Sequence, residues 1–218
     1  MVYILRMATD VSLKPRRGRP PKSRVDEADT RELLMRAGLE VLTEKGFATA
    51  GIDEILARVR VPKGSFYHYF ASKEAFGMEL IERYASYFAY KLDSHFGNQA
   101  LAPLDRLEAF VADAVSGMVR YDFKRGCLIG NLGQEMNGLP ESFRARLIEV
   151  FKDWEARTAA CLDAAKAQGQ VAPAADTAEL ACVFWIGWEG AVLRAKLERS
   201  ARPLQAFAQF FAAGLPRA

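Results

Sequence analysis

The chain has 218 residues, half of them hydrophobic, and carries 30 basic and 27 acidic side chains for a formal net charge of +3. No stretch approaches the roughly 20 consecutive apolar residues that a membrane-spanning helix requires, so we expect no membrane segment. The three cysteines are odd in number and widely spaced, which argues against a disulfide framework and favours reduced thiols in a cytoplasmic protein. A cysteine that senses oxidants stays open as an alternative.

Positive charge is concentrated at the start of the chain. Residues 1–25 hold seven basic side chains against one acidic side chain, so we interpret them as a disordered basic arm that binds a polyanion. Within this arm Arg17 and Arg19 flank Gly18 and precede Pro20, a pattern that resembles an AT-hook. The glycine lets the segment lie flat in the DNA minor groove, where the two arginines would extend along A·T tracts. The alternative is a solvated arm that contacts phosphates without sequence preference.

The first predicted helix begins near residue 30 and ends at Gly46. Asp29 and Glu32 form a capping-box pattern, in which the carboxylate of the first residue accepts from backbone N–H groups of the helix. The inward face follows at helical spacing and consists of Leu33, Leu34, Ala37, Val41 and Leu42. Gly46 suits the left-handed position that ends many helices, and Phe47 would fold back onto a small core.

Two shorter helices follow, and together they predict a helix-turn-helix. Residues 52–59 have helical periodicity, and residues 60–62 make a tight connection to the next helix. In this second helix Phe66 and Phe70 lie four residues apart on one packed face. Its polar side chains project elsewhere and suit phosphates and base edges in the major groove; they are Lys63, Ser65, Tyr67 and His68. Ser72 would cap a further helix that begins at about residue 73.

Three motifs occur in a fixed order in this region: Gly46-Phe47, Lys63-Gly64-Ser65-Phe66-Tyr67-His68-Tyr69-Phe70 and Ser72-Lys73-Glu74. Residues 30–76 thereby resemble the DNA-binding domain of the TetR family of transcriptional repressors. The resemblance implies an all-α protein, with a three-helix helix-turn-helix domain over residues 26–72 and a helical ligand-binding and dimerisation domain over residues 73–218. With the arm included, the DNA-binding residues that we predict are Arg17, Arg19, Lys63, Gly64, Ser65, Tyr67, His68 and Lys73.

Two residues depart from the family pattern. Gly51 stands where the family often has a Ser or Thr cap, and glycine is a weaker cap that helices tolerate. Arg60 stands in the turn where the family usually has glycine, so we expect slight strain if Arg60 takes a positive φ.

Glycines and prolines divide the rest of the chain into segments with helical periodicity. We predict helices over residues 73–96, 104–121, 141–168, 176–200 and 204–215, and a short or irregular segment over residues 127–137. The last two helices carry more large apolar side chains than one face of each would bury in a monomer. The resemblance implies that this pair meets its copy in a homodimer, which would bind a palindromic operator. The alternative is that these apolar side chains are all buried in the core of a monomer.

The resemblance also implies a ligand pocket in the second domain. Its polar candidates are Tyr84, Tyr121, Asn131, Gln134, Trp154, Trp185, Trp188 and Glu189, and Arg120 and Arg125 at the entrance would attract an anion. The stretches Val61–Phe76 and Gly126–Gln134 are similar to a subgroup that senses acrylate or related short, reactive carboxylates. We therefore predict a repressor that a small-molecule effector, a short carboxylate, releases from double-stranded DNA.

Two other classes of function are weighed against this prediction. The chain has two histidines and lacks a nucleophile elbow, a phosphate-binding loop and clustered metal ligands, so we expect neither catalysis nor a cofactor. The alternative is an architectural DNA-binding dimer that responds to no ligand. The aromatic side chains of the second domain argue against that alternative.

Overall fold

The computed structural model describes residues 24–217, and every regular element in that range is helical. The elements are α1 (Arg24–Lys45), α2 (Ile52–Val59), α3 (Phe66–Tyr69), α4 (Lys73–Phe96), α5 (Pro103–Arg120), α6 (Leu128–Gln134), α7 (Glu141–Ala167), α8 (Thr177–Glu198) and α9 (Arg202–Gly214), with 3₁₀ turns at Lys63–Ser65 and Met136–Gly138. The predicted all-α fold is confirmed. Among these residues no helix is both long and apolar enough to cross a membrane.

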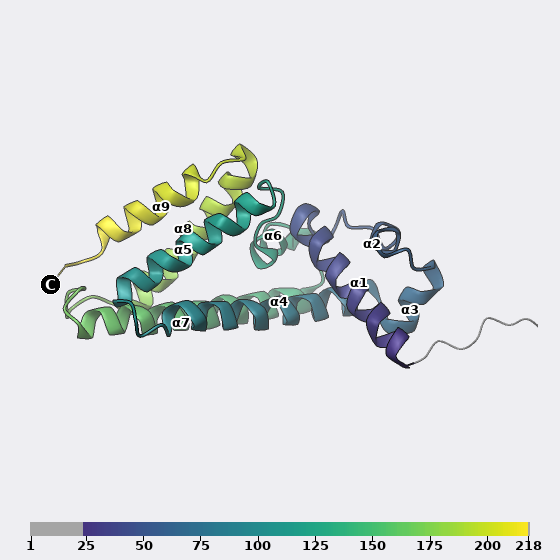
Figure 1. Ribbon diagram of the computed structural model, residues 1–218, viewed down its shortest axis with the longest axis horizontal. Coiled ribbons are helices and arrows are strands. Elements are labelled where there is room, and N and C mark those ends of the chain that lie inside the picture. The colour runs from purple at the N-terminus through teal and green to yellow at the C-terminus, as the bar shows by residue number, and fades with distance from the viewer. Residues whose placement is uncertain (1–23, 218) are drawn as a thin grey trace, which may run out of the picture.

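The molecule is elongated, with α1, α2 and α3 gathered at one end and the C-terminal end of α9 at the other (Figure 1). Helix α4 leads away from α3 and packs against α5 and α7. Helix α7 packs against α8, and α8 against α9. The short α6 touches α1 as well as α4 and α7, so it lies between the helix-turn-helix and the larger helical domain.

Helices α1 and α9 begin two or more residues earlier than the sequence patterns predict. Helix α1 begins at Arg24, so Asp29 and Glu32 lie inside it and the capping-box interpretation is wrong. No glycine or proline separates Arg24 from Asp29, and nothing in this stretch ends the helix. Helix α9 begins at Arg202 because Pro203 falls in its first turn, where the missing N–H costs no hydrogen bond.

Single residues set the backbone around the helix-turn-helix. Gly46 ends α1 with a φ of 85°, the left-handed conformation predicted for it. Arg60 ends α2 with a φ of 55°, so a bulky side chain occupies a conformation that favours glycine. Gly51 precedes α2 without any side-chain cap. Ser72 caps α4, as predicted, and accepts a hydrogen bond from the backbone N–H of Ala75 at 3.0 Å.

Aromatic rings fill the cores of both domains. In the helix-turn-helix Phe66, Phe70 and Phe76 are buried, and their ring centroids lie 4.6 to 5.3 Å apart. In the larger domain Trp154 and Trp185 are buried with ring centroids 4.9 Å apart. The buried residues of both parts belong to one continuous hydrophobic core.

Phe47 forms the apolar contact between the two domains. Its ring lies edge-on to Phe143 of α7 at a centroid distance of 5.1 Å, and the Lys73 ammonium lies over it at 4.5 Å. Gly77 of α4 allows both rings to approach, because a Cβ atom at this position would lie 2.5 Å from Phe47 and 2.7 Å from Phe143. Phe47 is thus wedged between α4 and α7 and fixes the helix-turn-helix on the larger domain.

Gly77→Ala tests this wedge. We expect it to lower the free energy of unfolding by about 1–3 kcal/mol, because the added methyl group forces two packed rings apart. Gly117→Ala is the matched control, since Gly117 also lies inside a helix but has no neighbouring atom within 4 Å of its Cβ position. The control should be neutral or up to about 1 kcal/mol stabilising. Urea unfolding measures both, and equal stability of the two variants would contradict the wedge.

Candidate functional site

The recognition segment presents a polar surface over a buried aromatic base. Phe66 is fully buried, whereas 58 % of the Tyr67 side chain is exposed. Lys63 and Gly64 are exposed beside it, and Ser65 is half-buried. The Lys63 ammonium lies 2.9 Å from the carboxylate of Asp53, and this hydrogen bond raises the pKa of Lys63. The structure therefore brings these predicted DNA-binding residues together on one surface.

The other predicted DNA-binding residues lie in different settings. His68 is exposed in α3, and its ring stands edge-on to Tyr69 at a centroid distance of 5.0 Å. Lys73 is partly buried, donates a hydrogen bond to the carbonyl of Phe47 at 2.8 Å, and has its pKa lowered by burial. Its ammonium thus belongs to the contact between the domains. Arg17 and Arg19 lie outside the described residues.

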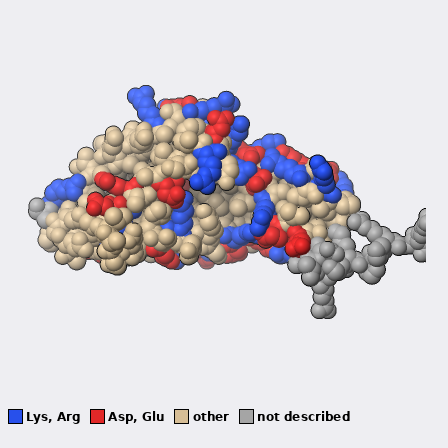
Figure 2. Space-filling model, viewed as in Figure 1, with Lys and Arg blue, Asp and Glu red and all other residues tan. Residues whose placement is uncertain are grey.

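A cavity of about 700 Å³ lies where α1 of the helix-turn-helix meets α4, α5 and α8 of the larger domain. Basic side chains gather in the middle of the molecular face shown in Figure 2. Aromatic side chains from α4, α8 and the end of α5 line the cavity, and they are Tyr84, Tyr87, Phe88, Tyr90, Tyr121 and Trp188. A volume of this size and an aromatic lining with a few charged groups are typical of small-molecule sites.

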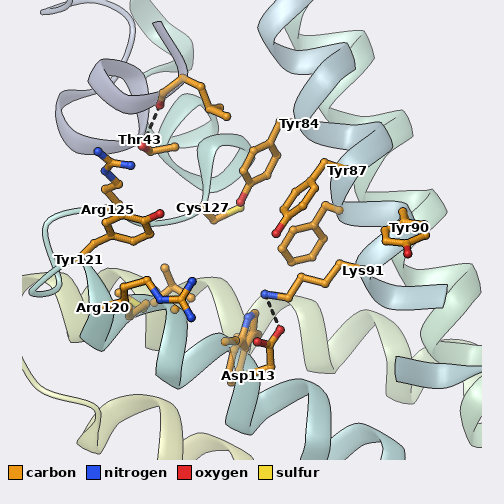
Figure 3. Close-up of a pocket in the computed structure, with 18 of the residues that line it drawn as sticks. Thr43, Tyr84, Tyr87, Tyr90, Lys91, Asp113, Arg120, Tyr121, Arg125 and Cys127 are labelled. Atoms are coloured by element: carbon orange, nitrogen blue, oxygen red, sulfur yellow. Dashed lines mark hydrogen bonds and ion pairs between the residues drawn. The ribbon is translucent and has the colours of Figure 1, made fainter. Parts of the chain in front are cut away.

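Most of the charged side chains of the cavity are paired with each other. Lys91 lies 2.7 Å from the carboxylate of Asp113, and His95 lies 3.2 Å from the same oxygen (Figure 3). Arg125 stacks on the ring of Tyr121 at 4.2 Å and contacts carboxylates of α1. Arg120 is different, because no carboxylate partner for it occurs in the described part of the chain. Its guanidinium is therefore available to an anion that enters the cavity.

A partly buried acid lies on the wall of the cavity where α8 meets α6. The carboxylate of Glu189 rests on the backbone of Gly130, where a Cβ atom would lie 1.8 Å from Oε2. Beside it are Cys127, whose Sγ accepts from the N–H of Gly130 at 3.4 Å, and Tyr84. Burial raises the pKa of Glu189 to about 7 and also raises the pKa of the Cys127 thiol and the Tyr84 phenol. This wall is therefore largely uncharged below neutral pH.

The C-terminal end of α1 is bonded to the larger domain beside this cavity. The Thr43 carbonyl accepts from the backbone N–H of Gly126 at 3.2 Å, from Asn131 Nδ2 at 2.9 Å and from Lys196 Nζ at 3.2 Å. The Glu135 carboxylate accepts from the backbone N–H groups of Phe47 and Ala48, at 2.9 and 2.8 Å. These bonds fix the helix-turn-helix to α6 and α8.

The structure separates the predicted ligand residues into two groups. Tyr84, Tyr121 and Trp188 line the cavity, as does Glu189. The remaining four have other partners. Trp154 and Trp185 are core residues, and Trp185 Nε1 donates to Thr158 at 2.9 Å. Asn131 holds α1, and Gln134 donates to the carbonyl of Gly130 at 3.3 Å.

Sequence reasoning missed several residues of the cavity, notably Lys91, His95 and Asp113. A signal for two of them exists, because Tyr84, Phe88, Lys91 and His95 recur at helical spacing along α4. The partner Asp113 comes from α5, and no local pattern connects it to α4. Among residues 24–217 no three acidic, histidine or cysteine side chains form a metal site.

Comparisons with known proteins agree with this architecture. Residues 34–79 match the family model described as bacterial regulatory proteins, tetR family, and residues 103–211 match the model described as the tetracyclin repressor-like C-terminal domain. The transcriptional regulator AcuR of Cereibacter sphaeroides is 54 % identical over 92 % of this chain and 91 % of its own length. The HTH-type transcriptional repressor NemR of Escherichia coli K12 is 34 % identical over 82 % of this chain and 90 % of its own.

Solved structures give the same result. The crystal structure of regulatory protein TetR from Rhodobacter sphaeroides is similar with a TM-score of 0.83 and 54 % identity, and the match covers 84 % of this chain and 97 % of that one. The reduced form of Escherichia coli NemR is similar with a TM-score of 0.76 and 29 % identity, over 87 % of this chain and 98 % of that one.

Glu189→Gln tests the partly buried acid. In the native state this carboxyl has a pKa of about 7, above its ordinary value of 4.5, so the parent protein loses stability as the pH rises from about 4.5 to 7. The variant has no charge to bury and should be more stable than the parent by about 1–3 kcal/mol at pH 8, with little difference at pH 5. Urea unfolding at the two pH values measures this.

Glu108→Gln is the control, since Glu108 is exposed on α5. It should show no such dependence on pH. A Glu189→Gln effect of equal size at pH 5 and pH 8 would show that Glu189 does not titrate near neutrality.

Proposed function

The chain belongs to the TetR family of bacterial regulatory proteins and is a helix-turn-helix transcriptional regulator. From that premise we propose that it is a cytoplasmic, homodimeric repressor. In this proposal a small carboxylate releases it from a palindromic operator. One observation carries the proposal. The cavity has α1 of the helix-turn-helix as one wall and helices of the larger domain as the others. A ligand held there contacts both domains and can favour one of their relative positions.

DNA binding is assigned to the exposed surface of the recognition segment. The side chains of Lys63, Ser65 and Tyr67 lie there over the buried ring of Phe66. Amine, hydroxyl and phenol groups of this kind hydrogen-bond to phosphates and to base edges in the major groove. Gly64 would let DNA approach the backbone closely, because it has no side chain and no other atom lies within 4 Å of its Cβ position.

Dimerisation is assigned to α8 and α9. Along α8 an exposed apolar stripe follows the spacing three, four, three, four and consists of Val183, Ile186, Gly190, Leu193 and Leu197. Ile186 and Leu197 are 70 and 75 % exposed, and Phe210 of α9 is 78 % exposed. Burying a continuous apolar stripe of this kind against a second helix pair is more favourable than leaving it exposed to water. The partner we propose is a second copy of the chain, so the operator would be palindromic.

The effector class follows from the charges of the cavity. Arg120 supplies an unpaired guanidinium, and Tyr84, Phe88 and Tyr121 supply an aromatic surface for a short carbon skeleton. An arginine binds a carboxylate through paired hydrogen bonds assisted by charge. The similarity to an acrylate-sensing subgroup in Val61–Phe76 and Gly126–Gln134 supports the same class. We propose acrylate or a related short carboxylate.

Tyr67→Ala tests the DNA-binding surface. On a duplex selected from a random pool by the parent protein, we expect at least a tenfold loss of affinity, because the variant removes a groove contact worth about 1–3 kcal/mol. Its fold should persist, since Tyr67 is exposed. Tyr90→Ala, an exposed tyrosine on α4, should retain the parent affinity for DNA. Parent-like binding by Tyr67→Ala, or one chain per duplex rather than two, would contradict the proposal.

Arg120→Gln tests the effector. Calorimetry should show acrylate binding to the parent protein and a loss of about 10- to 100-fold in the variant, because one charge-assisted contact to a carboxylate is removed. Affinity for DNA without acrylate should stay unchanged. Arg144→Gln, on the exposed surface of α7, carries the same charge change as a control. A parent protein that binds DNA equally well with and without saturating acrylate would instead favour the ligand-independent architectural dimer.

A further inference from the structure

Four charged side chains form a closed ring between the cavity and the helix-turn-helix. Glu40 and Glu44 of α1 each lie between two arginines, Arg58 of α2 and Arg125 of the segment that precedes α6. Arg58 lies 3.7 Å from Glu40 and 2.8 Å from Glu44. Arg125 lies 3.4 Å from Glu40 and 3.2 Å from Glu44. The two positive and two negative charges balance, so the ring is neutral as it stands.

The ring is partly shielded from water. The side chains of Arg125 and Glu44 are each 24 % exposed, that of Arg58 is 31 % exposed and that of Glu40 is 43 % exposed. The hydrogen bond from Arg58 holds the pKa of Glu44 below its ordinary range. Ion pairs that are partly removed from water are screened less by salt and depend more strongly on their partners than exposed pairs do. A change at one corner of the ring therefore affects the other three.

Arg125 places one corner of this ring in the effector cavity. It lines the cavity together with Glu40, and its guanidinium stacks on the ring of Tyr121 at 4.2 Å. Figure 3 shows Arg125 and Tyr121 on the same side of the cavity, with Arg120 close by. The neighbouring residue Gly126 donates its backbone N–H to the Thr43 carbonyl at the end of α1. Movement of Arg125 therefore acts on α1 through both ion pairs and this backbone bond.

Arg58 places the opposite corner in the helix-turn-helix. It lies two residues before Arg60, the residue with positive φ that starts the turn into the recognition segment. Arg58 also lies 3.4 Å from Glu54, which in turn pairs with Lys45 at 2.8 Å. The ring thus connects the cavity to the helix that positions the recognition segment. Arg125 is the member of the ring that the larger domain contributes.

We propose that Arg125 responds to the charge of the effector. The effector carboxylate pairs with the Arg125 guanidinium in place of Glu40 and Glu44, and the loss of these two ion pairs lets α1 and α2 move. This inference rests on the proposed carboxylate effector and adds how its binding reaches the DNA-binding helices. The guanidinium of Arg125 already pairs with two carboxylates, so the two glutamates and the effector cannot all keep full pairing with it. Neutral ligands of the same shape leave the ring intact.

Two variants and one ligand pair test the proposal. Arg58→Gln cuts the ring on the side away from the cavity and leaves Glu40 and Glu44 to pair with Arg125 alone. Acrylate should still bind, but no more tightly than it binds the parent, while DNA release fails. The double variant Glu40→Gln/Glu44→Gln removes the competitors for Arg125, so acrylate should bind about 5- to 10-fold more tightly. In both, the factor by which saturating acrylate weakens DNA binding should fall at least fivefold. In the parent, the neutral isostere acrylamide should not release DNA.

Glu79→Gln is the matched control, because it breaks an ion pair between α1 and α4, with Arg31, that lies outside the cavity. It should keep both the acrylate affinity and the release factor of the parent. Calorimetry gives the acrylate affinities, and fluorescence anisotropy of a labelled duplex gives the DNA affinities. Circular dichroism checks that each variant is folded.

The outcomes separate the two proposals. If the parent releases DNA with acrylate and both ring variants do so by the parent factor, the effector assignment stands and the role of Arg125 is overturned. Release of DNA by acrylamide as readily as by acrylate overturns the role of Arg125 as well. If acrylate does not bind the parent, the proposed effector fails and this inference fails with it.

Discussion

The Thr43 carbonyl, in the last turn of α1, is the point on which the rest of the structure depends. It accepts from Gly126, Asn131 and Lys196, which belong to three different parts of the larger domain. The end of a helix carries unsatisfied carbonyls and a partial negative charge, so a lysine and an amide are favourable partners there. Glu135 completes the connection by accepting from the loop that follows α1. The helix-turn-helix cannot turn relative to α6 and α8 unless some of these bonds break.

This constraint gives the proposed effector a route from the cavity to the DNA-binding helices. Its walls include Thr43 and Glu40 on α1 and Gly126 and Cys127 before α6, so a ligand touches the same residues that hold the two domains together. Ligand binding shifts an equilibrium only by the difference between its affinities for the two states. Because bonds to α1 and contacts to the ligand share residues, a large difference is physically reasonable here. A cavity deep inside the larger domain would need a longer route.

Local spacing in the sequence predicted the helices and the faces that they bury. It did not predict the cavity, which depends on how separate helices pack together. Phe66 and Phe70 lie four residues apart, and that spacing alone placed the recognition segment with its polar face outward. The cavity instead joins Glu40, Lys91, Asp113 and Glu189, which come from four helices, and no spacing rule brings them together. Asn131, Trp154 and Trp185 were chosen by residue type, which does not tell a ligand contact from a core position or a domain contact. The capping-box pattern failed because the same residues also fit a helix interior.

Hydrogen exchange at three amides tests the central claim most directly. The backbone N–H groups of Phe47 and Ala48 bond to Glu135, and that of Gly126 bonds to Thr43, so all three report the connection between the domains. The account predicts that saturating acrylate speeds exchange at these amides, while amides in the middle of α7 and α8 keep their protection. If acrylate releases DNA and these three amides exchange as slowly as before, the connection at the end of α1 does not carry the signal.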